Sequence, residues 1–223
     1  MLTIRAICEG PTDLVVIRAA LRAITTRDFQ LTMLQPDQSL YGGDAGPHGG
    51  GWKGVRGYLQ SAAEAGGLGV VGALTPDVDL LVVHLDADVA DETEIACACP
   101  CPPAMDTIRA LESLILGWLG LEAASLPGKL ALCIPSKSTE AWILHTLFPN
   151  RAPQRSDIEC LADPASRLVG GKPKLVRRRG TKIKKRLSEY QSLAPRLQKG
   201  WPSTADALES ARRFDEDLRR ILP

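Results

Sequence analysis

The feature of this sequence that most limits its fold is an apolar run that ends abruptly in acids. Residues 80–85 are large and apolar except for His84, and acidic residues follow from Asp86 onward. A short apolar run without polar alternation is typical of a strand buried on both faces, as in the middle of a parallel sheet covered by helices. The chain is therefore expected to fold as an α/β protein around this strand.

Two carboxylates, Asp86 and Asp88, follow the predicted strand. Side chains two positions apart on a strand point the same way, and open α/β sheets bind their ligands at the carboxyl ends of the strands. Carboxylates crowded there repel one another unless a cation or a shared proton neutralises them, and their oxygens suit Mg²⁺ or Mn²⁺. The alternative is that Asp86 caps the following turn and Asp88 is simply solvated.

Two more acids follow predicted strands. Residues 3–8 are expected to form a strand with Glu9 directly behind it, and residues 129–134 another, with Glu140 in the first turn of the next helix. Because the carboxyl ends of parallel strands meet at one edge, both acids are expected to join the aspartate pair. Capping of its helix is the alternative role for Glu9.

The remaining pattern alternates strands and helices. It predicts a strand at residues 29–34 and helices at about 14–26, 55–65 and 103–119. This alternation is typical of a parallel sheet covered by helices, which we expect to occupy residues 1–148. Residues 42–57 are rich in glycine. This composition indicates either a loop whose backbone approaches phosphates or a flexible linker over the sheet edge.

Charge is unevenly distributed along the 223 residues. Residues 1–150 hold 9 Lys and Arg against 17 Asp and Glu, whereas residues 151–223 hold 18 against 9. Such asymmetry indicates a polyanionic partner. The sequence shows neither a long apolar stretch that could cross a membrane nor the pattern of a signal peptide, so we expect a cytoplasmic protein without a membrane partner.

The basic tail contains nine cations and no acid between positions 172 and 186, a run suited to binding nucleic-acid phosphates. These residues are Lys172, Lys174, Arg177, Arg178, Arg179, Lys182, Lys184, Lys185 and Arg186. Apolar residues at helical spacing beyond them predict two helices that pack back onto the sheet, so residues 149–223 are expected to form a basic helical appendage. The alternative is that the run is only the solvated face of that appendage.

Six cysteines in a cytoplasmic chain predict free thiols and no disulfide. Cys8 and Cys133 fall within predicted strands and are expected in the core. Cys97, Cys99 and Cys101 form a C-x-C-x-C run without the second pair of ligands that a structural zinc site needs. A surface loop with free thiols is therefore the main expectation, and zinc binding is the alternative.

The residues around the acids resemble a known family. Glu9-Gly10 after one strand and Asp86-x-Asp88 after another resemble the paired signature of TOPRIM domains, which occur in topoisomerases, bacterial primases, OLD-type nucleases and some RNA-processing nucleases. The stretches C-E-G-P-T-D and S-T-E-A-W-I-L more closely resemble small stand-alone TOPRIM-like proteins, many of them thought to act in bacterial defence beside an ATPase. The resemblance covers about residues 3–148. It implies a Rossmann-like sheet on which Glu9, Asp86 and Asp88 bind Mg²⁺ or Mn²⁺, with Glu140 as an additional acid.

Size narrows the functions that the resemblance implies. A topoisomerase needs a gate and a nucleophilic tyrosine in further domains, and a primase needs a priming and zinc-binding apparatus, for which 223 residues leave no room. We expect a metal-dependent nuclease acting on DNA or RNA through Glu9, Asp86, Asp88 and Glu140, with nucleic acid and an ATPase as partners and a homo-oligomer left open. Two alternatives are a non-catalytic binding protein of the same fold and a phosphatase of the haloacid-dehalogenase type, whose nucleophile motif is also D-x-D after an apolar strand.

Overall fold

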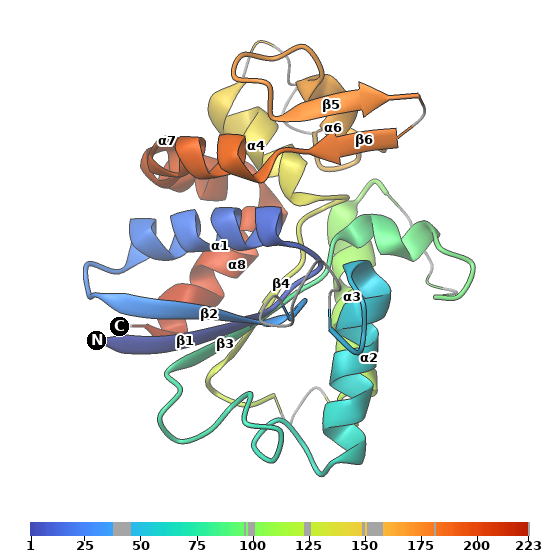
Figure 1. Cartoon of the computed structure of the whole chain (residues 1–223), viewed down its shortest axis with the longest axis vertical. Coiled ribbons are helices and arrows are strands. Elements are labelled where there is room, and N and C mark those ends of the chain that lie inside the picture. Colours follow the sequence, from blue (N-terminus) through green and yellow to red (C-terminus); the bar gives the residue numbers. More distant parts are fainter. Residues whose placement is uncertain are drawn as a thin grey trace.

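A computed structural model of the chain describes residues 1–37, 46–95, 97, 101–122, 126–148, 150, 158–180 and 182–222. Within these ranges the chain forms a four-stranded parallel sheet, a two-stranded antiparallel hairpin and surrounding helices (Figure 1). The strands are β1 (Leu2–Ile7), β2 (Phe29–Gln35), β3 (Leu80–His84), β4 (Leu130–Cys133), β5 (Val176–Arg179) and β6 (Lys182–Lys185). The helices are α1 (Pro11–Ile24), α2 (Gly51–Glu64), the short 3-10 helix η1 (Ala87–Asp91), α3 (Ala104–Trp118), α4 (Thr139–Leu147), α6 (Pro164–Leu168), α7 (Leu187–Ala207) and α8 (Glu209–Ile221).

The main sheet confirms the predicted α/β architecture. Its strands run parallel in the order β2-β1-β3-β4. Every residue of β3 is buried, as the apolar run indicated. In the register of the sheet, Val83 lies opposite Ile7 of β1, and His84 lies opposite Cys133 of β4. The carboxyl ends of these three strands therefore align at one edge.

Helices cover both faces of this sheet. Leu80 and Val82 pack into a core with α1, α4, α7 and α8, whereas Leu81 and Val83 pack into a second core with α2 and α3. Figure 1 shows α1 lying between the sheet and α7. Because both faces of β3 are covered, its sequence needs no polar alternation. Among the described residues, no helix combines the length and apolar character needed to cross a membrane.

The two helices predicted near the C-terminus are present and share the core of the sheet. The ring centroid of Trp142 on α4 lies 5.3 Å from that of Trp201 on α7 and 6.2 Å from that of Phe214 on α8. The Trp142 indole N–H donates to Ser210 Oγ at 2.9 Å. One hydrophobic core thus joins the sheet to both helices. A domain boundary near residue 148 stays a prediction.

The basic run itself forms a hairpin and not a helix, and the description of residues 149–223 as a basic helical appendage stays a prediction. Residues 176–179 and 182–185 pair as an antiparallel hairpin, with Arg177 opposite Lys184. Buried Val176 and partly buried Ile183 supply the β-branched residues that strands favour. Gly180, with φ of +63°, lies in the short connection between the strands, and a glycine there is typical of hairpin turns.

The cysteines follow the prediction only in part. Cys8 and Cys133 are buried, as expected. Cys101, however, forms a disulfide with Cys160, so the expectation of free thiols is wrong for this residue. Its partner lies 59 residues away along the chain, a separation that local spacing cannot reveal. Cys97 is partly buried, and Cys99 lies outside the described residues.

The glycine-rich segment is a loop only in part, because α2 begins at Gly51 and not near residue 55. Gly54 allows close packing against the preceding loop. A Cβ at this position would lie 2.5 Å from Gln35 Nε2 and 2.6 Å from the carbonyl oxygen of Gly49. This glycine is therefore explained by the packing of α2, while Gly42 and Gly43 lie outside the described residues.

Candidate metal centre

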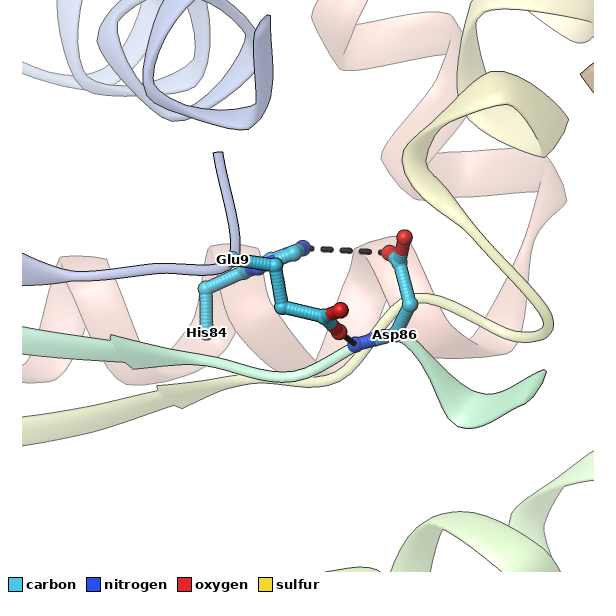
Figure 2. A group of neighbouring side chains, drawn as sticks. All are labelled: Glu9, His84 and Asp86. Carbon is cyan, nitrogen blue, oxygen red and sulfur yellow. Dashed lines mark hydrogen bonds and ion pairs between the residues drawn. The ribbon is translucent and has the colours of Figure 1, made fainter. Parts of the chain in front are cut away.

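Three side chains able to bind a metal ion meet at the carboxyl edge of the sheet (Figure 2). Glu9 follows β1, His84 ends β3, and Asp86 lies two residues beyond it. One ligand atom from each lies within 4.8 Å of the other two. The neighbouring parallel strands β1 and β3 bring these residues together. The sequence predicted Glu9 and Asp86 at this place but gave no role to His84.

Backbone N–H groups hold the two carboxylates. Glu9 Oε1 accepts a hydrogen bond from the N–H of Asp86 at 2.7 Å, and Asp86 Oδ1 accepts one from the N–H of Thr139 at 3.2 Å. Thr139 is the first residue of α4, so the positive end of that helix dipole faces Asp86. Asp86 therefore caps a helix, but this helix is α4 and not the turn that directly follows β3.

His84 has no exposed surface. Its Nε2 lies 3.2 Å from Asp86 Oδ1, and Figure 2 shows the ring directed toward that carboxylate. Within the described part of the chain, however, neither ring nitrogen has a partner with hydrogen-bond geometry. Buried polar atoms are nearly always hydrogen-bonded. The contact with Asp86 involves Nε2 alone, so it leaves Nδ1 without an acceptor among the described residues.

A second group of charged side chains borders the first. Asp13 of α1 accepts a hydrogen bond from Thr139 Oγ1 at 2.8 Å. Glu140 Oε1 accepts one from the Tyr190 hydroxyl at 2.7 Å and lies 2.8 Å from Lys185 Nζ. The same Nζ lies 3.7 Å from Asp13 Oδ1. Since Asp13 and Glu140 are both buried, Lys185 supplies the cation that buried carboxylates require.

The four predicted catalytic acids thus occupy different positions. Glu9 and Asp86 belong to the three-residue group that can hold one ion, and Asp88 and Glu140 lie outside that group. Asp88 is in η1 with an exposed side chain, whereas Glu140 is buried and paired with a lysine. Asp88 nevertheless lies within electrostatic range of Asp86 and Glu140, so all four acids contribute to one negative region.

The pKa values of the carboxyls at the sheet edge are raised. Burial is the main cause for Glu9, followed by repulsion from Asp86, and its pKa reaches about 8. Burial also raises the pKa of Asp86, although His84 opposes the shift. Part of Asp88 is open to solvent, but the protein around its carboxyl still displaces enough water to raise the pKa, and the charge of Asp86 raises it further. A bound cation would stabilise the ionised form of all three carboxyls.

The same acids also raise the pKa values of the two basic side chains beside them, His84 and Lys185. Burial alone would lower the pKa of His84, but the charges of Asp13 and Asp86 outweigh burial and raise this pKa to about 9. Burial also opposes the charge of Lys185, yet Glu140 and Asp13 raise its pKa well above the ordinary value. The acids therefore dominate the electrostatics of the site, and such a field attracts cations.

The donor atoms of Glu9, His84 and Asp86 fit a divalent cation. Ligands that bind one ion at about 2.1–2.4 Å lie at most about 4.8 Å from one another, since opposite ligands are separated by twice that length. The atoms of this group meet that limit. Neither nitrogen of His84 has a hydrogen bond among the described residues, although Nε2 lies 3.2 Å from Asp86 Oδ1. The composition and spacing of this group therefore allow it to hold a metal ion.

The nine basic residues predicted to bind nucleic acid are placed in different surroundings. Lys185 is directed toward the buried acids, and Arg186 pairs with Glu189 at 2.8 Å. The exposed members are Lys172, Lys174, Arg177, Arg178 and Lys184. The side chains of Arg179 and Lys182 lie outside the described part of the structure. An exposed basic surface thus continues into the acid cluster through Lys185.

Sequence reasoning gave no role to Asp13 and His84, although both had a usable signal. Asp13 stands in the first turn of the helix behind Glu9, so it starts from the same sheet edge. His84 lies two residues before Asp86 and shares its face of the strand. Lys185 was predicted to bind nucleic acid, but its contact with Asp13 and Glu140 had no local signal, because that contact depends on where the hairpin packs.

Searches of protein-family models, curated proteins and solved structures find no match for this chain.

Proposed function

We propose that this protein is a divalent-metal-dependent nuclease built on a TOPRIM-like sheet. The supporting observation is that Glu9 and Asp86 meet at the carboxyl edge of the sheet, where the basic hairpin directs Lys185 into the neighbouring acids. Hydrolysis of a phosphodiester requires a metal site for the reacting phosphate and a cationic surface for the rest of the strand. Both features are adjacent here.

In this proposal Glu9 and Asp86, with Asp88, hold Mg²⁺ or Mn²⁺. A bound ion would neutralise the scissile phosphate and lower the pKa of an attacking water. Asp88 is exposed, which suits a carboxylate on the side where substrate arrives. Glu9 has a second candidate role as general base, because its pKa of about 8 lies near the pH at which proton transfer is effective.

Lys185 and Glu140 place a positive charge beside this centre. The Lys185 ammonium is fixed by its contact with Glu140, which is itself held by the Tyr190 hydroxyl. A cation positioned before the reaction stabilises the charge that develops on phosphate oxygens. Arg177 and Lys184 on the exposed side of the hairpin would bind other phosphates of the strand without reading its sequence.

The resemblance to small stand-alone TOPRIM-like proteins supports two further parts of the proposal, a role in bacterial antiphage defence and an ATPase as partner. Both rest on the stretches C-E-G-P-T-D and S-T-E-A-W-I-L. Co-purification of an ATPase with the tagged protein from its source cells would test the second part.

Cleavage of end-labelled single- and double-stranded DNA and RNA tests the proposed activity. We expect the protein to cleave at least one substrate with Mg²⁺ or Mn²⁺ and to lose this activity in EDTA. Asp86→Asn should lower the rate by on the order of 10²-fold or more. Substrate binding should be retained or become tighter, because the substitution removes a negative charge that faces phosphate.

Asp106→Asn is the matched control. Asp106 lies on α3 in an exposed ion pair with Arg109 at 3.6 Å, so this variant should cleave like the unmodified protein. Cleavage that persists in EDTA or in the Asp86→Asn variant would contradict the proposal. Nucleic-acid binding without cleavage would favour a non-catalytic protein, and Asp86-dependent hydrolysis of p-nitrophenyl phosphate would favour the phosphatase alternative.

A further inference from the structure

We infer that His84 is itself a metal ligand, and that the centre therefore selects a transition-metal ion such as Mn²⁺ over Mg²⁺. This inference rests on the metal site of the proposed function and deepens it by naming the class of ion. The carboxylates alone would accept either ion. A nitrogen donor changes that balance.

The first support is the environment of the imidazole. His84 is fully buried, and among the described residues its Nδ1 and Nε2 have no hydrogen-bond partner. A histidine in a strand core normally gives one nitrogen to a backbone or side-chain acceptor. Two buried nitrogens without a hydrogen bond therefore indicate a further partner outside the described polypeptide, beside the 3.2 Å contact of Nε2 with Asp86 Oδ1.

The second support is the direction of the ring. Leu80, Val82 and His84 lie on the same face of β3, the face covered by α1. Nε2 lies 3.2 Å from Asp86 Oδ1, and the ligand atoms of Glu9, His84 and Asp86 all lie within 4.8 Å of one another. Figure 2 shows the imidazole and both carboxylates converging from two neighbouring strands.

A protonated His84 that only neutralises Asp86 explains these contacts less well. An imidazolium has two N–H donors that both need acceptors. Nε2 faces Asp86 Oδ1 at 3.2 Å without hydrogen-bond geometry, and Nδ1 has no acceptor among the described residues. A neutral imidazole that binds metal through Nε2 uses the nitrogen nearest the carboxylates. It leaves only the Nδ1–H without an acceptor, so metal binding satisfies more of the buried polar atoms.

Donor chemistry then decides the class of ion. Mg²⁺ prefers oxygen ligands and keeps several waters. Imidazole nitrogen suits first-row transition metals, whose affinity for such sites rises from Mn²⁺ toward Cu²⁺. Two carboxylates and one imidazole therefore favour Mn²⁺ and its neighbours.

Pulsed electron paramagnetic resonance of the full-length protein with MnCl₂ tests this inference without any substitution. We expect the spin-echo modulation of bound Mn²⁺ to contain ¹⁴N frequencies, and these should be replaced by ¹⁵N frequencies after labelling of histidine with ¹⁵N. The chain contains 3 histidines, so the labelled signal has few sources. Mn²⁺ that binds at one equivalent without nitrogen modulation would overturn the inference.

A substitution separates His84 from the other histidines. His84→Gln places an amide oxygen near the position of Nε2, so it should lower Mn²⁺ affinity by on the order of 10–100-fold and change Mg²⁺ affinity by less than about threefold. The nitrogen modulation should disappear as well. His145→Gln is the control, because His145 of α4 contacts Thr204 Oγ1 of α7 and is not part of the acid cluster. This variant should leave the affinities for Mn²⁺ and Mg²⁺ unchanged. Equal losses of affinity for Mn²⁺ and Mg²⁺ in the His84→Gln variant would overturn the inferred selectivity for Mn²⁺.

The results also separate this inference from the nuclease proposal. Nitrogen-coupled Mn²⁺ in a protein that cleaves no nucleic acid would support the His84 assignment and contradict nuclease activity. Cleavage with Mn²⁺ in the absence of nitrogen coupling would support nuclease activity and contradict the His84 assignment. If His84→Gln fails to unfold cooperatively, the labelled unmodified protein still decides the question.

Discussion

Glu140 and Glu9 show two ways in which single carboxylates are accommodated at this sheet edge. Glu140 pairs with the Lys185 ammonium at 2.8 Å and accepts a hydrogen bond from the Tyr190 hydroxyl at 2.7 Å. Glu9 accepts the backbone N–H of Asp86 at 2.7 Å, and its pKa is raised to about 8 by burial and by Asp86. The polypeptide therefore supplies a cation to Glu140, whereas Glu9 lies in the group that would bind a metal ion.

This difference predicts that the metal-free protein loses stability as pH rises. The folded pKa of Glu9, about 8, exceeds the unfolded value near 4.5, so the folded state keeps a proton that the unfolded chain releases within this window. His84 acts in the same direction between 6.5 and about 9. Thermal unfolding in EDTA from about pH 5.5 to about pH 8.5 should therefore show a falling midpoint.

Added Mn²⁺ should oppose this loss, because metal binding requires deprotonated carboxylates and becomes stronger as pH rises. The rise in midpoint on adding Mn²⁺ should thus be larger at about pH 8 than at about pH 6. Glu9→Gln should flatten the pH dependence and reduce the effect of metal. Equal stabilisation by Mn²⁺ at both pH values would contradict the prediction.

For single residues, the sequence predicted the location of those that directly follow a strand. Glu9 and Asp86 come immediately after β1 and β3, so the parallel topology alone brings them together. Asp13 and Lys185 were not predicted as a pair, because their contact at 3.7 Å joins α1 to a hairpin far along the chain. Local patterns do not contain that information.

Among the elements, the hairpin of β5 and β6 links the basic surface to the acid cluster. Successive side chains of a strand point to opposite faces, so Lys184 is exposed while its neighbour Lys185 reaches Glu140. Charge counting recognised the basic run but could not separate these two roles. The turn glycine, Gly180, was the local sign of a hairpin in this run.

The exposed side of the hairpin should control nucleic-acid affinity. Arg177→Gln combined with Lys184→Gln should weaken binding at all sequences and reduce the slope of log affinity against log salt by about 0.7–0.9 for each phosphate that the variant no longer neutralises. Fluorescence anisotropy at several salt concentrations measures both effects. The cleavage rate at saturating substrate should change little, because neither side chain belongs to the acid cluster.

A matched pair on α7 controls for net charge. Arg196 and Lys199 are exposed, and replacing both with Gln removes the same charge as the hairpin variant. We expect this control to bind nearly as well as the unmodified protein. Equal weakening by the two double variants would mean that only overall charge matters, and the hairpin would then have no specific role.

In the whole molecule, the C-terminal helices complete one of the two layers that cover the sheet. α7 and α8 share a core with α1 and α4, while α2 and α3 cover the opposite face. The parallel sheet could be predicted because local residue patterns indicate the alternation of strands and helices. The core that the sheet shares with α7 and α8 could not be predicted. It depends on contacts between segments far apart in the chain, such as the hydrogen bond between Trp142 and Ser210.

This shared core predicts that residues 1–148 alone will not form a stable domain. The fragment lacks β6, α7 and α8. Trp142 therefore loses Trp201 and Phe214, and Glu140 loses the Lys185 ammonium and the hydroxyl of Tyr190. Each large apolar side chain returned to water costs about 1.5–3 kcal/mol, and a few such changes equal a typical stability of about 5–15 kcal/mol. Circular dichroism of the fragment should therefore show no cooperative thermal transition.

Co-expression of residues 149–223 as a separate chain provides the control for that experiment. This piece carries the missing helices and Lys185, so a complex of the two should regain a cooperative transition and bind Mn²⁺ like the intact protein. A fragment of residues 1–148 that unfolds sharply and binds Mn²⁺ with full affinity by itself would contradict the prediction. It would instead establish an independent domain that ends near residue 148, because a stable core would then exist without the layer that α7 and α8 supply.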